Sequence, residues 1–179
     1  MSFWPWLLRL ANVVPSEERD GIHMIGPCWE VHGQVDPCAF LRALPSVVPE
    51  DAILFLEGGH HPPALRDFIQ ANAVPAPATV RRGTVWPRET VFHLPATPEV
   101  LTQLAELAEH CAGPEICSHL HVYRGRAVLV EWHDAFDPPF FLSKALCDDR
   151  LRSFRVQLNV TLHESIGHAD LSGKREPAE

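Results

Sequence analysis

The sequence lacks long hydrophobic runs and CxxC pairs, and it has almost no lysine. Among its 15 lysines and arginines, only Lys144 and Lys174 are lysines. No apolar stretch approaches the roughly 20 residues of a membrane-spanning helix, so we expect no membrane association. The five cysteines are an odd number and widely spaced, which argues against a secreted disulfide framework and against a zinc ribbon. These absences favour a protein of the reducing cytoplasm.

Clustered positive charge is also scarce. The 23 acidic residues outnumber the 15 basic ones and give a formal net charge of −8. A duplex-binding protein needs grouped cations to displace counterions from phosphates. The densest arginine groups lie within residues 81–88 and 150–155, and three arginines along one helix are typical of a solvated surface. We therefore expect no nucleic-acid partner.

What is present is enough chain for one ordinary domain. A chain of 179 residues buries roughly 70% of its unfolded surface and needs no metal to hold a core. We expect a single domain over residues 1–162, beginning with an apolar segment at 1–14 that has no basic leader or small-residue cleavage site. Residues 163–179 are polar and are expected to form a flexible tail.

Period-2 and continuous apolar runs alternate with helical runs along the chain. Strands are expected at about 22–34, 52–57, 78–86 and 90–94. Helices are expected after the Asp36-Pro37 cap, over 63–72, and from the Thr97-Pro98 cap to Gly113. This order predicts an α/β fold, or a mixed α+β one, with helices packed on a single mixed β-sheet.

Near the end of the domain, two apolar runs are separated by a short turn. Residues 116–123 and 126–132 flank Arg124-Gly125, which predicts a β-hairpin with a two-residue loop. A closing helix with Ser143 as its N-cap is expected after this C-terminal hairpin.

The two-residue loop also predicts which side chains share a face. His119 is expected opposite Val130, and His121 opposite Val128. Both histidines then lie on one face, while Glu131 lies on the other face with the core residues.

The two histidines suggest a metal site. His119 and His121 on one strand are about 6.5–7 Å apart at the backbone, a spacing that two zinc ligands can use. The candidates for a third ligand are His133, Asp134 and Asp137, or else Glu57, His60 and His61. An open fourth position would make a hydrolytic zinc site. The alternative is that the histidines are structural and no cofactor is bound, since no HExxH motif supports a metal.

A second candidate is the strand-to-helix turn Gly58-Gly59-His60-His61. Glycines allow close approach of a ligand, and a helix N-terminus offers N–H groups to an anion. The two prolines that follow remove donors from that position. The alternative is a tight loop whose glycines only accommodate the turn.

Signals for nucleophilic catalysis are weaker. There is no G-x-S-x-G motif. Cys117 is expected beside Trp132 in apolar surroundings, where a raised thiol pKa makes it inert. If His133 acts as a base, Asp137 is the better carboxylate to orient it, because adjacent Asp134 is awkwardly placed.

Aromatic side chains gather in two places. Trp4 and Trp6 lie in the apolar N-terminal segment, and Phe140 and Phe141 in a predicted loop. Such residues are enriched at interface centres, although both clusters could instead close over the domain's own core.

The sequence therefore predicts a non-catalytic cytoplasmic binding domain that self-associates or binds a protein partner. The alternative is a metal-dependent, zinc-type hydrolase that uses the His119/His121 strand and the His133–Asp137 loop.

Overall fold

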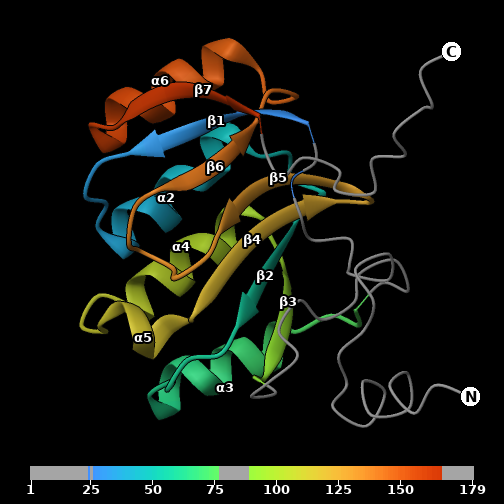
Figure 1. Ribbon diagram of the computed structural model, residues 1–179. Helices are drawn as coiled ribbons and strands as arrows, with labels where there is room; N and C mark the ends of the chain where they lie inside the picture. The colour runs from blue at the N-terminus through green and yellow to red at the C-terminus, as the bar shows by residue number, and fades with distance from the viewer. Residues whose placement is uncertain (1–23, 25, 77–88, 167–179) are drawn as a thin grey trace, which may run out of the picture.

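One seven-stranded sheet forms the centre of the protein. The computed structural model describes residues 24, 26–76 and 89–166. The strand order is β3-β2-β4-β5-β6-β1-β7 (Figure 1), and every neighbouring pair is antiparallel. The strands are β1 (Pro27–His32), β2 (Ile53–Glu57), β3 (Val91–Pro95), β4 (His119–Arg124), β5 (Ala127–Trp132), β6 (Phe140–Ser143) and β7 (Thr161–Ile166).

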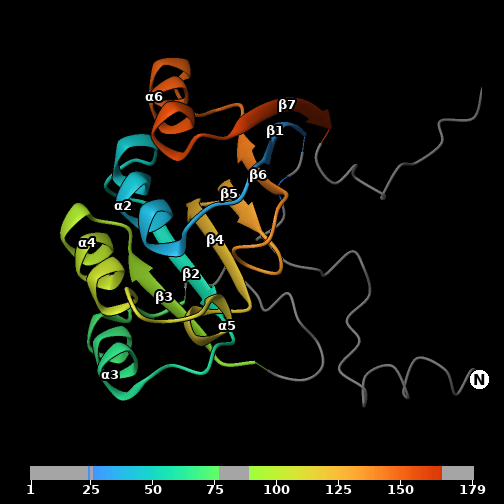
Figure 2. The ribbon, with the colours of Figure 1, turned by 90° about the vertical axis from the view of Figure 1, so that its left-hand side faces the viewer.

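The four longer helices cover one face of this sheet, which we call the helical face (Figure 2). The helices are α2 (Pro37–Val47), α3 (Pro63–Asn72), α4 (Pro98–Leu107), α5 (Gly113–Ile116) and α6 (Asp148–Leu158). None of the helices within the described residues is long and apolar enough to span a membrane.

Local capping explains where two of the helices begin. The Asp36 side chain accepts a hydrogen bond of 2.8 Å from the Ala39 N–H at the start of α2. Thr97 caps α4 in the same way. Each cap is followed by a proline, whose fixed φ suits the first helical position. Both helix starts are as the sequence predicts.

The core lies between the helices and the helical face. Phe40 of α2 is at its centre, with its ring centroid 4.8 Å from Trp132, 5.5 Å from Phe140 and 5.9 Å from Phe154. All four rings are fully buried. Edge-to-face aromatic packing of this kind joins two helices to the middle of the sheet.

The predicted fold class, with helices packed on a single sheet, is confirmed, although the sheet is antiparallel throughout rather than mixed. Three further differences lie in the last third of the chain. Residues 140–143 form strand β6 where a loop is expected. Helix α6 begins at Asp148 rather than after Ser143. Strand β7 extends into the segment expected to be a tail, because it pairs with β1 along its whole length. The predicted strand at 78–86 and the apolar segment at 1–14 lie outside the described residues.

The predicted hairpin is present, but its register is wrong. The turn is Gly125-Arg126, and the pairing shifts between Val122 and Tyr123, which leaves Leu129 as an extra residue in β5. Tyr123 is opposite Val128, but His121 is opposite Glu131 rather than Val128. A bulge reverses which face the following residues occupy. Glu131 therefore lies on the face of the histidines, and the neighbouring Trp132 lies in the helical core.

Candidate functional site

The face of the sheet opposite the helices carries a row of histidine, glutamate and phenylalanine, and we call it the histidine face. The row crosses all seven strands in register, from β3 to β7. In strand order, its residues are His93, Phe55, His121, Glu131, Phe141, Glu30 and His163.

Most of the polar groups in the centre of this face are buried. Among the described residues, the buried charged or imidazole side chains are Glu57, His93, His121 and Glu131, each exposed by 5% or less. Burying such groups is costly unless they are hydrogen-bonded or paired. The hydrogen bonds and ion pairs of these side chains therefore show whether they are available to bind a ligand or are used to hold the fold together.

His93 and Tyr123 form a buried pair. The His93 Nδ1 lies 2.9 Å from the Tyr123 hydroxyl, and the Phe55 ring lies 5.4 Å from the His93 ring. Burial lowers the pKa of His93 and raises the pKa of Tyr123 to about 12. Both groups are therefore neutral near pH 7, which suits a structural hydrogen bond in an apolar environment.

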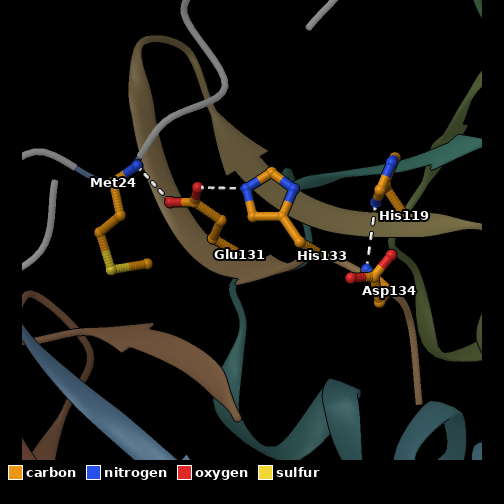
Figure 3. A network of polar contacts seen from close by, with 5 residues as sticks. All are labelled: Met24, His119, Glu131, His133 and Asp134. Carbon is orange, nitrogen blue, oxygen red and sulfur yellow. Dashed lines mark hydrogen bonds and ion pairs between the residues drawn. The ribbon is translucent and has the colours of Figure 1, made fainter. Parts of the chain in front are cut away.

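Glu131 and His133 form the most polar contact on this face (Figure 3). The Glu131 carboxylate accepts a hydrogen bond of 2.5 Å from the Met24 N–H and lies 2.7 Å from the His133 Nε2. The Glu131 side chain is fully buried, whereas the His133 side chain is 40% exposed. A carboxylate can only accept, so the His133 Nε2–H donates. Glu131 thereby connects the segment at Met24 to the end of β5, 107 residues further along the chain.

The structure brings together the three predicted histidine ligands. The His133 ring centroid lies 5.3 Å from that of His119 and 5.0 Å from that of His121. However, the His119 Nδ1 accepts a hydrogen bond of 3.1 Å from the Asp134 N–H, as Figure 3 shows. The proton of a neutral His119 ring is then on Nε2, so neither nitrogen offers a free lone pair to a metal. Within the described residues, no three His, Cys, Asp or Glu are arranged to hold a metal ion.

Asp137, the fourth predicted ligand, contacts the core through its backbone. Its carbonyl oxygen accepts a hydrogen bond of 2.6 Å from the Trp132 indole N–H, and the residue itself is exposed. The carboxylate that orients His133 is that of Glu131, not that of Asp137. The difference follows from the bulge, which moves Glu131 to the histidine face.

Two backbone donors of the predicted anion loop are used within the protein. The Gly58 N–H donates to the Thr90 carbonyl at 2.9 Å, and the His60 N–H donates to the Pro114 carbonyl at 3.1 Å. The His61 Nε2–H donates to the Ile116 carbonyl at 2.8 Å, and burial lowers the pKa of His61. Gly58 and Gly59 both have positive φ. These contacts are those of a tight loop rather than of an anion cradle.

The loop glycine Gly58 also explains the close packing around Ser118. A Cβ at Gly58 would lie 2.4 Å from the Ser118 Oγ, too close for any larger residue to fit without a shift. The neighbouring Cys117 is buried, and burial raises the pKa of its thiol far above the usual range. Cys117 therefore belongs to the core and is not a nucleophile.

The residues predicted for an interaction surface are divided. The Phe140 side chain is fully buried in the helical core, so it does not present its ring to a partner. Phe141 is half-buried on the histidine face and packs against a small cluster that includes Met24, Cys28 and Val128. Trp4 and Trp6 lie outside the described residues.

Three features of the face are not identified by sequence reasoning. Glu131 is assigned to the wrong face, His93 is not predicted to bond to Tyr123, and β7 is not predicted as a strand. Only β7 has a sequence signal of its own, since Leu162 lies between the polar residues Thr161 and His163 in a short alternating run.

Comparison with known proteins gives no match. No family model, no curated protein and no solved structure is significantly similar to the chain.

Proposed function

We propose that this protein is a non-catalytic binding domain that associates with a protein, either a partner or a second copy of itself. The observation that carries this proposal is the outer strand β7. It pairs with β1 on one side and, within the described part of the chain, with no strand on its other side. An outer strand presents backbone N–H and C=O groups that another chain can pair with.

The state of the candidate chemical groups supports the same proposal. The atoms that chemistry would need at His119, His61 and Cys117 are hydrogen-bonded within the protein or buried. All five cysteines are free thiols, which agrees with a proposed location in the reducing cytoplasm.

The second candidate is a metal-dependent hydrolase, and one observation favours it. The ring centroid of His133 lies 5.3 Å from that of His119 and 5.0 Å from that of His121, so the three imidazoles are close together. To bind zinc, His119 would have to give up its hydrogen bond to the Asp134 N–H. This function therefore requires the site to rearrange before the metal binds.

Sedimentation and native mass spectrometry of the full chain, with and without zinc chloride, test the two functions. We expect association with a second copy or with a captured protein, and no stoichiometric metal. The variant His163→Lys places a charge in the outer strand and should abolish the association. A matched control is Gln70→Lys, an exposed position on α3 at the opposite end of the sheet.

Two outcomes contradict the proposal. One is a wild-type chain that stays monomeric and captures only those proteins that the His163→Lys variant also captures. The other is one equivalent of zinc that is lost in the double variant His119→Ala/His121→Ala, which would establish the second candidate instead.

A further inference from the structure

A small hollow lies on the helical side of the outer strand, between α6 and the β1–β7 pair. Its volume is about 160 Å³. Its floor is apolar and its rim is charged, and the lining residues are Trp29, Asp148, Leu151, Arg152, Arg155 and Leu162. Because the hollow adjoins the edge of the sheet, a strand added to β7 would run beside it.

The rim of the hollow has a cation that pairs with no acidic side chain among the described residues. Arg152 lies 3.3 Å from Asp149, whereas Arg155 forms no ion pair with any residue that the structure describes. Asp148 also lines the hollow, at the other end of α6. The hollow is thus most positive near Arg155, in a chain whose net charge is −8.

Strand β7 carries an exposed acidic side chain on the helical face, the face on which the hollow lies. The Glu164 carboxylate lies 3.1 Å from the Lys144 Nζ, and the Glu164 side chain is 71% exposed. Lys144 in turn lies 4.7 Å above the Trp29 ring. Glu164 on β7 and Arg155 on the neighbouring helix α6 therefore place opposite charges at one edge of the sheet, with Arg155 lining the hollow together with Leu162, two residues before Glu164.

From this arrangement we infer that β7 pairs with β7 of a second copy, which extends the sheet across a two-fold axis. The inference rests on the proposed function. A two-fold interface needs a surface that is complementary to itself, and this edge has an arginine on α6 and, on β7, a glutamate that is 71% exposed beside Lys144. In such a pair, residues that face each other lie on the same face of the sheet.

The charges select the register of this pairing. With His163 at the axis, Leu162 is opposite Glu164 of the second copy. The Glu164 carboxylate of the second copy then lies beside Arg155 of the first, because Arg155 lines the hollow together with Leu162. The two-fold axis produces the same contact a second time with the copies exchanged. With Glu164 at the axis, two like charges would face each other, which is unfavourable.

The other edge of the sheet does not offer the same opportunity. The Val74 N–H donates to the His93 carbonyl of β3 at 2.8 Å, and Val74 belongs to no strand of the sheet. This bond covers part of the outer edge of β3. One capped edge and one open edge give a closed pair rather than an extended fibre.

A charge-swap experiment tests the inference. We expect Arg155→Glu and Glu164→Arg each to raise the dissociation constant of the dimer at least about tenfold, as measured by sedimentation of the full chain. The double variant Arg155→Glu/Glu164→Arg should dimerise at least about threefold more tightly than either single variant, because the intermolecular pair is re-formed with its charges exchanged. Recovery stays incomplete, because the positive charge at position 164 then lies beside Lys144. Arg150→Glu makes the same charge change on an exposed position of α6 outside the hollow and is the matched control.

Each other result overturns the inference. A monomeric wild type, single variants that still dimerise normally, an Arg150→Glu variant that is equally impaired, or a double variant without recovery all contradict it. Urea unfolding of each variant shows whether a loss of dimer reflects a loss of folding. If the wild type is monomeric but captures a protein that His163→Lys does not, the inference fails while the proposed function holds.

Discussion

The two faces of the sheet are stabilised by different interactions. On the helical face, Phe40 packs against three aromatic rings, and most of the other residues of that core are aliphatic. On the histidine face, the buried groups include two carboxylates and two imidazoles. Apolar packing is non-directional and accepts many arrangements, whereas a buried polar network is satisfied in only one. We therefore expect the helical face to provide most of the stability and the histidine face to select the strand register.

The strongest test of this comparison removes the central ring of the helical face. Phe40→Ala should lower the free energy of unfolding by about 3–5 kcal/mol, since it leaves a cavity between Trp132, Phe140 and Phe154. Urea denaturation measures the change. Val156→Ala, at a position 71% exposed on α6, should change stability by less than about 0.5 kcal/mol. Equal effects of the two substitutions would contradict the assignment of the core.

A second test breaks the polar contact at the centre of the histidine face. Glu131→Ala should cost about 1–3 kcal/mol, because the Met24 N–H and the His133 ring lose their acceptor. Glu131→Gln retains an amide oxygen and should cost less. Hydrogen exchange at the Met24 amide should accelerate in Glu131→Ala. If neither the free energy of unfolding nor the exchange rate of the Met24 amide changes in Glu131→Ala, Glu131 does not connect these segments.

A third and smaller effect on the histidine face is the pH dependence of stability. Burial lowers the pKa of His93, so below its ordinary value of about 6.5 the unfolded chain binds more protons than the folded chain. Stability should therefore fall as the pH drops below about 6.5, and the contribution of His93 to this loss between pH 7.5 and 5.5 is at most about 1.4 kcal/mol. His93→Asn should reduce this loss, measured by urea denaturation at both pH values. His61, whose pKa is also lowered, provides a comparison variant, His61→Asn. An unchanged pH dependence in His93→Asn would show that His93 does not titrate in this way.

The parts of the fold that depend on local signals are predictable from sequence. Asp36-Pro37 and Thr97-Pro98 identify two helix starts because a cap and its helix are neighbours in the chain. Strand β2 is predicted because its apolar run is continuous. The hairpin is predicted from its turn, but its register is not.

The errors at the site have one main physical cause. The extra residue Leu129 is set by how β5 fits against both β4 and β6, and no local pattern records that fit. The shift moves Glu131 to the other face, so the orienting carboxylate of His133 is missed. The grouping of His119, His121 and His133 is predicted correctly, but their internal hydrogen bonds depend on contacts that the sequence does not show. Strand β7 is missed because its partner β1 is more than a hundred residues away.

The position of β1 also determines the order in which the sheet can assemble during synthesis. Cys28 of β1 pairs with Ser143 of β6 and with Ser165 of β7, so β1, the first of the described strands in the chain, can pair only after the last two of them have been made. The strands β2 to β5 lie next to one another in the sheet and can form while the rest of the chain is being made. Contacts between distant parts of a chain form slowly, and unpaired edges are prone to aggregation in the meantime. Among the described strands, β1 therefore has no partner and β5 has an uncovered edge until β6 and β7 have been made, and the seven-stranded sheet is assembled only after β7.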